Sequence, residues 1–454
     1  MGTALPDGVS ALIPEYLGHQ RWFSGGAAPP AVQVTVVDAD QLAVTAGGAH
    51  RLLWALVAVA GPEPAQYQLV LGERPNGELA PFLSGRPGSV LGSVGDRYYY
   101  DATVDPEMAL ALLGVLTGGA EVAERVRPIS AEQSNSSLVY DDRLIAKVFR
   151  RLHSGPNPDV VVTEALAAAG FTHVAAPVAT WRRDGTDLAF VQRYLAGGTE
   201  GWALALTSLR DLYASRPDDP AEAGGDFAAE AARLGGMTSG MHLALAEAFG
   251  VDRVEFRTRG WPAVLAEVED GLRRVVGAAW EGSARHLLDQ LQELADPGPA
   301  IRCHGDFHLG QVMRTDRGWY VLDFEGEPAR AMDERLKPCS PFKDVTGMLR
   351  SFQYAANFVL LERDVREREE LAGLAEGWER HNRDAFLEGY FATPGIGDLL
   401  PEGSDVRAGV SLALELQKAL YELEYERAYR PDWASIPESA IQRILAGSFS
   451  GSDG

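Results

Sequence analysis

The chain has 454 residues, enough for two or three domains with separate hydrophobic cores. Its composition of 46% hydrophobic and 23% charged residues is typical of a folded globular protein, and its net charge of −23 argues against binding to nucleic acid or to an anionic membrane surface. The two cysteines, Cys303 and Cys339, form no C-x-x-C pair, which excludes a zinc ribbon or a disulfide framework. We see no signal peptide and no apolar run that could span a bilayer, so we expect a cytoplasmic protein.

Residues 1–100 are predicted to form a β-rich cap subdomain. The segments 32–44 (VQVTVVDADQLAV) and 65–74 (AQYQLVLGER) have the alternation and β-branched content of half-buried strands. A helix is then expected between Asp105 and Gly119, because it starts with acidic residues and stops at a Gly-Gly pair.

Residues 101–202 are predicted to form an intermediate subdomain built on a second sheet. Strands separated by a polar turn are expected within 126–151, a helix after Pro158, and a hairpin from 175–183 to 187–195. Residues 203–454 have mostly helical periodicity, interrupted by a short loop-and-strand insertion at 302–328. The expected fold class is therefore α+β, with a helical C-terminal lobe.

Five residues occur in the order in which protein kinases present their functional parts. Lys147 on a strand would point a positive charge at nucleotide phosphates, and Glu164 on the following helix would hold that lysine. Asp306 would accept the proton of an acceptor hydroxyl, and Gln311 and Asp323 would supply oxygen ligands to Mg²⁺. Each residue alone could be a surface or capping residue, but their common order favours phosphoryl transfer.

No glycine-rich nucleotide loop of the G-x-G-x-x-G or G-x-x-x-x-G-K-[ST] type is present. The corresponding turn reads SAEQSNSSL (130–138), in which Ser134 and Ser136 could donate hydrogen bonds to phosphates. A polar hairpin turn without a ligand explains the same composition, so both interpretations stay open.

The segments HGDFHLGQ (304–311) and VLDFEGEP (321–328) resemble those of the aminoglycoside phosphotransferase-like kinases. More narrowly, EQSNSSLVY, DVTGMLRSFQYAA and RPDW resemble the bacterial maltokinases and the related actinobacterial glucosamine kinases, and the similarity covers nearly the whole chain. This resemblance implies a protein-kinase-like bilobal fold with an N-terminal cap, and it implies ATP and Mg²⁺ as cofactors.

The resemblance also implies roles for individual residues: Lys147 for the phosphates, Asp306 as catalytic base, and Gln311 with Asp323 for magnesium. Glu325 is expected near the metal. The hinge after the second sheet, where backbone groups would contact adenine, falls at Gln192, Tyr194 and Leu195.

Several positions depart from the usual maltokinase pattern, and the departures are expected near the sugar pocket. They are Phe307, Gln353, Gln417, Glu424 and Tyr429. They weaken a plain maltokinase assignment without affecting phosphoryl transfer.

A helix near the C-terminus carries the predicted sugar site. Glu422 and Glu426 lie four residues apart, on one face, and two carboxylates that converge on a pocket would suit an ammonium-bearing ligand such as a 2-amino sugar, or would accept hydrogen bonds from a neutral sugar. Trp433 would provide a flat apolar surface for the pyranose ring. A solvated helix face is the alternative, because Lys418, four residues before Glu422, could neutralise it.

We therefore expect a monomeric ATP-dependent sugar kinase that converts glucosamine to glucosamine 6-phosphate, with only the sugar and ATP as partners. The alternative acceptor is maltose, phosphorylated to maltose 1-phosphate. An aminoglycoside phosphotransferase and a catalytically inactive kinase-fold sensor are the other candidates. No binding to nucleic acid or membranes is expected.

Overall fold

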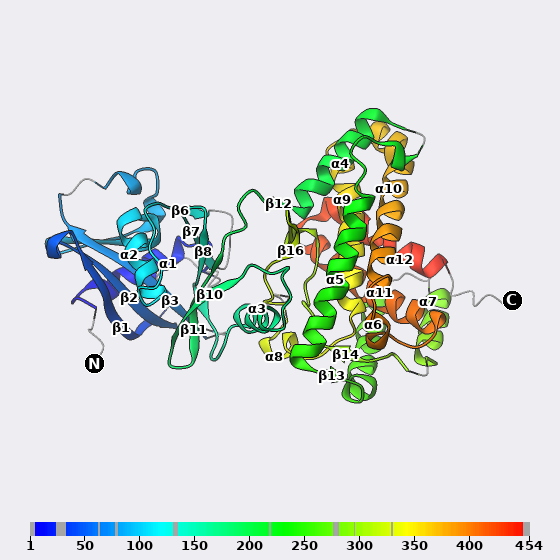
Figure 1. The fold of residues 1–454 in the computed structure, drawn as a ribbon, viewed down its shortest axis with the longest axis horizontal. Helices are drawn as coiled ribbons and strands as arrows, with labels where there is room; N and C mark the ends of the chain where they lie inside the picture. The colour runs from blue at the N-terminus through cyan, green and yellow to red at the C-terminus, as the bar shows by residue number, and fades with distance from the viewer. Residues whose placement is uncertain are drawn as a thin grey trace. The chain divides into compact units, whose positions relative to one another are not determined.

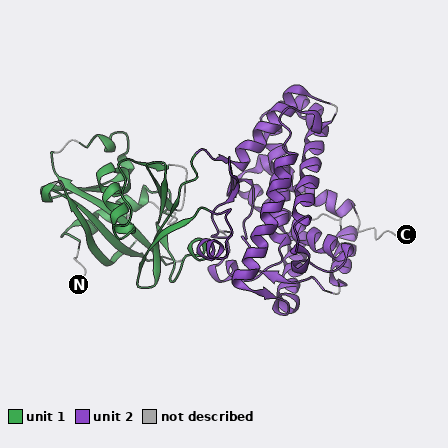
Figure 2. Cartoon of the chain, in the orientation of Figure 1, with its two compact units in different colours: residues 1–161, 175–196 green, residues 162–174, 197–454 purple. Residues whose placement is uncertain are grey.

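The computed structural model describes residues 5–23, 33–61, 64–77, 80–129, 135–217, 219–275, 281–294, 296–327 and 330–447. The chain divides into two compact units, which are described separately: unit 1 contains residues 1–161 and 175–196, and unit 2 contains residues 162–174 and 197–454 (Figure 2). Within the described ranges, every helix falls short of the length and apolar character needed to cross a membrane.

Unit 1 contains two antiparallel sheets. The first has the order β1-β2-β3-β5-β4, and the second has the order β10-β11-β8-β7-β6 (Figure 1). The bounds of the first sheet are β1 (Val34–Thr45), β2 (His50–Val59), β3 (Ala65–Pro75), β4 (Val90–Val94) and β5 (Arg97–Asp101), with β9 (Arg151–Leu152) added to β3. The bounds of the second are β6 (Val126–Ile129), β7 (Asn135–Tyr140), β8 (Leu144–Phe149), β10 (Pro177–Arg183) and β11 (Thr186–Arg193).

The two sheets of unit 1 share one hydrophobic core. Helix α2 (Pro106–Leu116) begins where the Asp105 carboxylate accepts the Glu107 N–H, as the acidic start of this segment predicted. Its apolar face packs in a single cluster with Trp54 of the first sheet and Tyr140 of the second. Because buried side chains join the sheets, the structure has no break near residue 100, and the three-subdomain division stays a prediction.

Buried polar contacts also connect the two sheets. The Gln68 side chain on β3 donates to the carbonyl oxygens of Phe149 and Leu188, and the Arg150 guanidinium binds the Asp101 carboxylate at 2.7 Å. Arg150 and Asp101 are almost fully buried, so each satisfies the charge of the other. Helix α1 (Ile13–Gly18) packs on the first sheet, and the Tyr16 hydroxyl donates to Asp101 at 2.6 Å.

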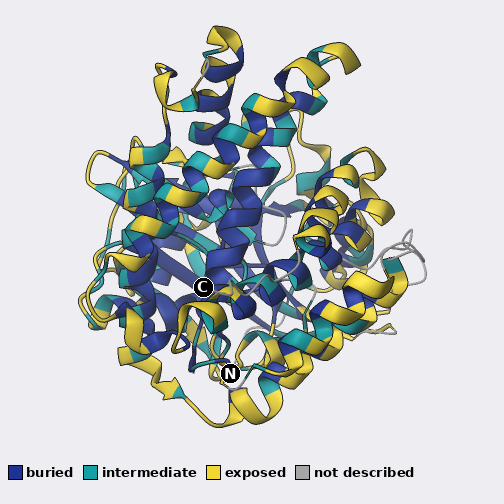
Figure 3. Cartoon of the chain, turned by 90° about the vertical axis from the view of Figure 1, so that its right-hand side faces the viewer, coloured by how far each residue is buried: buried dark blue, intermediate teal, exposed yellow. Residues whose placement is uncertain are grey.

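Unit 2 is mostly helical, as predicted, with buried positions along the inward faces of its helices (Figure 3). The bounds of its helices are α4 (Gly201–Ser215), α5 (Ala228–Phe249), α6 (Trp261–Val275), α7 (Glu281–Gln292), α8 (Met332–Arg335), α9 (Phe342–Leu361), α10 (Val365–Phe391), α11 (Ser404–Tyr429) and α12 (Ser435–Ala446). The insertion at 302–328 forms β15 (Val312–Thr315) and β16 (Gly318–Val321), which pair with each other, and β15 also pairs with β12 (Thr199–Glu200). Strand β13 (Val251–Asp252) pairs with β14 (Ala300–Ile301). Helix α3 (Pro158–Ala168) spans the division between the units.

Helix α9 is the central element of unit 2, and most of its residues are buried among the neighbouring helices. It lies against the loop formed by residues 304–311. Gly347 makes this close approach possible, because a Cβ atom there would stand 2.6 Å from the carbonyl oxygen of Phe307. The 304–311 loop is therefore supported directly by the most buried helix of the unit.

Candidate active site

The 304–311 loop is held by a buried carboxylate on α9. Asp344 Oδ2 accepts the backbone N–H of His304 at 2.8 Å, and Asp344 Oδ1 accepts that of Gly305 at 2.9 Å. The Asp344 carboxylate also contacts His242 Nε2, which lies on α5, at 3.1 Å. Asp344 and His242 are both fully buried, so the loop is fixed by a group that water does not compete for.

His304 has a structural role. Its Nε2 donates to the carbonyl oxygen of Leu322 at 2.9 Å, and its ring packs against Phe307 and Phe324. Because Leu322 immediately precedes Asp323, this hydrogen bond ties the 304–311 loop to the segment that carries the second predicted aspartate.

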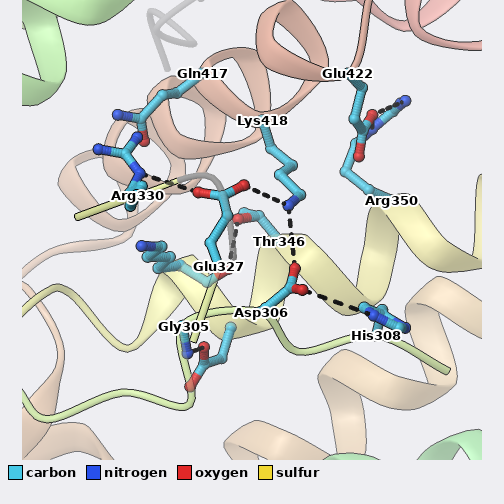
Figure 4. A network of polar contacts seen from close by, with 12 residues as sticks. Gly305, Asp306, His308, Glu327, Arg330, Thr346, Arg350, Gln417, Lys418 and Glu422 are labelled. Carbon is cyan, nitrogen blue, oxygen red and sulfur yellow. Dashed lines mark hydrogen bonds and ion pairs between the residues drawn. The ribbon is translucent and has the colours of Figure 1, made fainter. Parts of the chain in front are cut away.

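Asp306 lies beside a lysine on α11. Lys418 Nζ is 3.4 Å from Asp306 Oδ1, and His308 Nε2 is 4.0 Å from Asp306 Oδ2 (Figure 4). Burial raises the pKa of Asp306, but the positive charge of Lys418 and the neighbouring His308 and His304 outweigh it, so the pKa lies below its usual value. Asp306 is thus an ionised carboxylate, the form required of a general base. For His308, burial has the opposite effect and lowers the pKa of the imidazole.

Gln311 and Asp323 lie together at the end of β16. Gln311 Nε2 is 3.4 Å from Asp323 Oδ2, and the buried Asp323 Oδ1 has no hydrogen-bond partner within the described part of the chain. Asp323 also has φ of 64°, a left-handed conformation that aspartate tolerates better than most residues. A buried carboxylate oxygen without a donor, beside a side-chain amide, fits the oxygen ligands that Mg²⁺ prefers.

In the part of the chain that the structure describes, no three His, Cys, Asp or Glu side chains converge at metal-binding distance. A metal ion here would therefore complete its coordination with water and phosphate oxygens, as Mg²⁺ does in nucleotide sites. The role of Glu325 stays a prediction.

Glu422 and Glu426 of α11 differ in their partners. Glu422 Oε2 accepts from Arg350 Nη2 at 2.6 Å and from Arg350 Nε at 2.8 Å, and Arg350 is fully buried on α9. Glu426 Oε1 accepts from Arg430 at 2.8 Å and from the Tyr354 hydroxyl at 3.3 Å, while Glu426 Oε2 is buried and has no hydrogen-bond partner among the described residues. Burial raises the pKa of Glu422, although Arg350 and Lys418 oppose this effect. Glu426 thus retains an acceptor that the fold does not use.

Trp433 is half-buried rather than fully open. Its ring lies against Phe358, with centroids 5.3 Å apart, and the Arg430 guanidinium stands 4.6 Å from its centroid. The predicted use of this ring as a platform for a sugar stays a prediction.

The residues that depart from the maltokinase pattern have different surroundings. Gln417 Nε2 donates to Glu267 on α6 at 2.7 Å, and Glu424 binds Arg274 of the same helix. The Tyr429 side chain is 72% exposed, which places it on the surface of the helix end. By contrast, Gln353 accepts from the buried Arg350, next to Glu422. The expectation that the departures are concentrated near the sugar pocket stays a prediction.

In unit 1, Lys147 is paired with an acid that the sequence did not single out. Lys147 Nζ binds Asp159 Oδ2 at 3.0 Å, at the start of α3. Glu164 lies in the portion of α3 that belongs to unit 2, and its pairing with Lys147 stays a prediction.

The predicted nucleotide residues of unit 1 are partly engaged within the sheet. Ser134 lies outside the described residues, and the Ser136 hydroxyl accepts from Arg150 Nε at 2.8 Å. The Gln192 side chain donates to the Ala175 carbonyl at 3.4 Å, and the Tyr194 N–H donates to the Arg143 carbonyl at 2.9 Å. The Tyr194 N–H is thus already used, whereas Leu195 follows the last strand of the sheet and is half-buried.

Sequence reasoning missed Asp344 and Arg350, and it assigned Lys418 to the neutralisation of Glu422. Lys418 instead bridges Asp306 and Glu327, at 3.4 and 3.1 Å. A charged residue inside an apolar helical run was the available signal: Asp344 lies in PFKDVTGML, and Lys418, one of four lysines in the chain, lies in LALELQKALYEL.

Comparisons with known proteins match two parts of the chain. Residues 125–326 match the Phosphotransferase enzyme family, and residues 16–105 match the Maltokinase N-terminal cap domain. The chain therefore carries a phosphotransferase domain preceded by a maltokinase-type cap, with a protein-kinase-like fold.

Among individual proteins, a glucosamine kinase of Mycolicibacterium smegmatis is 27% identical over 73% of this chain and 82% of its own length. A glucosamine kinase of Streptacidiphilus jiangxiensis is 28% identical over 74% of this chain and 77% of its own. The solved structure of a glucosamine kinase in complex with glucosamine, ADP and inorganic phosphate covers 98% of this chain and 100% of its own, with a TM-score of 0.65 and 21% identity. That structural likeness establishes the fold.

Proposed function

We propose that this protein is an ATP- and Mg²⁺-dependent kinase that phosphorylates glucosamine at its 6-hydroxyl. The observation that carries the proposal is the similarity to curated glucosamine kinases over about three quarters of the chain. The fixed position and ionised state of Asp306 in this chain support it. In the reaction, Asp306 accepts the proton of the sugar hydroxyl, and the oxygen of that hydroxyl bonds to the γ-phosphorus of ATP. The bond from that phosphorus to the bridging oxygen breaks, and ADP leaves.

Gln311 and Asp323 would hold the magnesium ion, whose charge would neutralise phosphate oxygens during transfer. The unpartnered Asp323 Oδ1 supports this assignment, and Glu325 would lie near the metal. In unit 1, Lys147 would bind phosphates, with Glu164 as its partner and Ser134 and Ser136 nearby. The backbone from Gln192 to Leu195 would form the adenine-binding hinge.

For the acceptor, Glu426 supports an amino sugar, because its Oε2 is buried and has no donor. An ammonium group at this oxygen would satisfy it with a charge-assisted hydrogen bond. Glu422 and Trp433 would complete the sugar site. We further propose that the protein is a cytoplasmic monomer with no macromolecular partner, divided into the cap (1–100), the intermediate subdomain (101–202) and the helical lobe (203–454).

The maltokinase-type cap supports a second acceptor, maltose phosphorylated at its 1-hydroxyl. A coupled ADP-release assay with ATP and Mg²⁺ distinguishes the two, with glucosamine, glucose, N-acetylglucosamine, maltose and an aminoglycoside as acceptors. We expect kcat/KM for glucosamine to exceed that for glucose and maltose by at least about tenfold, as expected for a charge-assisted contact. A preference for maltose would overturn the glucosamine assignment, and turnover of none of the acceptors would overturn the kinase assignment.

A further inference from the structure

Lys418 belongs to a closed ring of polar contacts that begins and ends on α11. Its Nζ is 3.1 Å from Glu327 Oε1, and the other oxygen of Glu327 binds Arg330 Nε at 2.9 Å (Figure 4). Arg330 Nη2 binds Glu267 Oε2 at 2.8 Å, and the same oxygen accepts from the Gln417 side chain at 2.7 Å. Because Gln417 directly precedes Lys418, the ring returns to the helix from which it starts.

This ring fixes a side chain that is ordinarily mobile. A lysine has four rotatable side-chain bonds and loses about 2 kcal/mol of rotamer entropy when it is immobilised. Here Glu327 holds the ammonium from one side, and Glu327 is itself held by Arg330. The Lys418 ammonium therefore has a defined position before any ligand binds, 3.4 Å from the carboxylate of Asp306.

The charge around Asp306 makes Lys418 its principal counter-ion. The charged groups that act on Asp306 are Lys418 from α11 and two histidines of its own loop, His304 and His308. Tyr421 of α11 and Glu327 lie close to Lys418. Lys418 has the strongest effect among the cations, whereas burial alone disfavours the ionised form. One ring nitrogen of each histidine has another partner: His304 Nε2 donates to the Leu322 carbonyl, and His308 Nδ1 accepts the Gly310 N–H, while His308 Nε2 lies 4.0 Å from Asp306 Oδ2.

We propose that Lys418 is a positioning residue for Asp306: its ammonium, fixed by the polar ring, holds the Asp306 carboxylate in place and ionised, ready to accept the acceptor proton. This role rests on the proposed phosphotransfer function. It differs from a contact with substrate, because Lys418 acts through Asp306.

The first test compares the pH profiles of kcat/KM for the wild type, Lys418→Met and Lys418→Arg. Removing the cation from a buried carboxylate raises its pKa, so the acid limb of Lys418→Met moves up by about one to three pH units. Lys418→Arg keeps the charge and the acid limb stays within about half a unit. Arg274→Met, which breaks the α11–α6 ion pair with Glu424, is the matched control and leaves the limb unchanged. An acid limb of Lys418→Met that coincides with the wild type overturns the proposal, whatever the value of kcat.

A double-mutant cycle tests the same point by another readout. If Lys418 acts through Asp306, Lys418→Met lowers the residual single-turnover rate of Asp306→Asn by less than about twofold, although it lowers the wild-type rate at pH 6 by about tenfold or more. Equal loss in both backgrounds overturns the proposal, because Lys418 would then act on another group.

The wild-type acceptor assay separates this test from the substrate assignment. If the wild type prefers maltose, the glucosamine assignment fails and the pH profiles are measured with maltose.

If the wild type turns over no acceptor, thermal unfolding replaces the kinetics. We then compare the melting temperature of Lys418→Met with that of the double variant Lys418→Met/Asp306→Asn. The difference should fall as the pH rises from about 5 to 8, because the Asp306 carboxyl group, with its folded-state pKa raised in Lys418→Met, loses its stabilising effect over that range. The difference between the wild type and Asp306→Asn should stay constant over that range, and identical behaviour of the two pairs overturns the proposal. If Lys418→Met does not fold, Lys418→Gln replaces it in every arm.

Discussion

Asp344 accepts the backbone N–H of Gly305 at 2.9 Å through one oxygen and that of His304 at 2.8 Å through the other. The residue next to Gly305 is the proposed base, so the position of Asp306 is set from the backbone by a carboxylate on another element. Asp344 is fully buried and its partners are all protein groups, which makes it a structural anchor for the site.

Replacing Asp344 with Asn should lower the free energy of unfolding by about 1–3 kcal/mol, because an amide can accept only through its single oxygen. Thermal unfolding measures the loss, and Asp333→Asn on the exposed surface is the control. A melting temperature equal to that of the wild type would contradict the anchoring role.

The same substitution makes a pH prediction. Burial raises the pKa of Asp344, but His242, His304 and the hydrogen bond from Gly305 outweigh it and hold the pKa below its usual value. The stabilisation is therefore fully present above about pH 4, the pKa of an unperturbed Asp, and is lost as the pH falls below it. The difference in melting temperature between the wild type and Asp344→Asn should be constant from about pH 8 to pH 5 and shrink below about pH 4. A difference that grows on acidification would be inconsistent with this sign.

Asp306→Asn should lower kcat by about 10²- to 10⁴-fold, the usual contribution of a general base. Because the carboxylate of Asp306 pairs with Lys418 and lies near His308 of its own loop, the substitution should leave the affinity for ADP within about twofold, measured by calorimetry. Asp316→Asn, in the exposed turn between β15 and β16, should behave as the wild type. A variant that keeps more than about a tenth of kcat would refute the assignment of the base.

The two glutamates of α11 should separate stability from acceptor binding. Glu422→Gln removes the carboxylate that the buried Arg350 binds, and breaking such a pair costs about 3–5 kcal/mol. Glu426→Gln should unfold close to the wild type but raise KM for glucosamine by about tenfold or more, with KM for glucose unchanged. Steady-state kinetics and thermal unfolding measure the two effects. Equal KM values for glucosamine in the wild type and Glu426→Gln would remove Glu426 from the acceptor site.

Asp323→Asn tests the metal site without disturbing the backbone, since asparagine also tolerates positive φ. The Mg²⁺ concentration for half-maximal activity should rise by about tenfold or more, because a neutral amide is a weaker ligand than a carboxylate. Gln311→Ala should cause a smaller rise. Asp142→Asn, at another left-handed position in an exposed turn of unit 1, is the control. An unchanged Mg²⁺ requirement in Asp323→Asn would place the metal elsewhere.

Gln417→Asp adds a negative charge at a position that departs from the maltokinase pattern and faces Glu267. The structure predicts a loss of about 1 kcal/mol in stability at low salt, because two carboxylates would meet, and no change in the ratio of kcat/KM for maltose to that for glucosamine. Gln417→Ala removes the hydrogen bond without adding charge and serves as the comparison. A shift of that ratio toward maltose would show that Gln417 does influence the acceptor.

Much of this protein follows from local patterns in its sequence. The strands of unit 1 follow from alternating β-branched residues, and α2 begins at a capping aspartate. These features depend on near neighbours in the chain. The order of Lys147, Asp306, Gln311 and Asp323 predicted a phosphotransferase for the same reason, because each motif is a short local unit.

The partners of the charged residues depended on the tertiary structure. Lys418 lies four residues before Glu422, which suggested a helical ion pair, yet it binds Asp306 and Glu327, while Glu422 binds Arg350 of α9. Asp344 likewise serves a loop that precedes it by many residues. Sequence spacing limits which charges can meet on one helix, but a long side chain reaches several elements, and burial decides which partner it takes because an unpaired charge is so costly there. The sequence by itself therefore determined the chemistry this protein carries, and only the packing of α9 and α11 around the 304–311 loop decided which residues hold that chemistry in place.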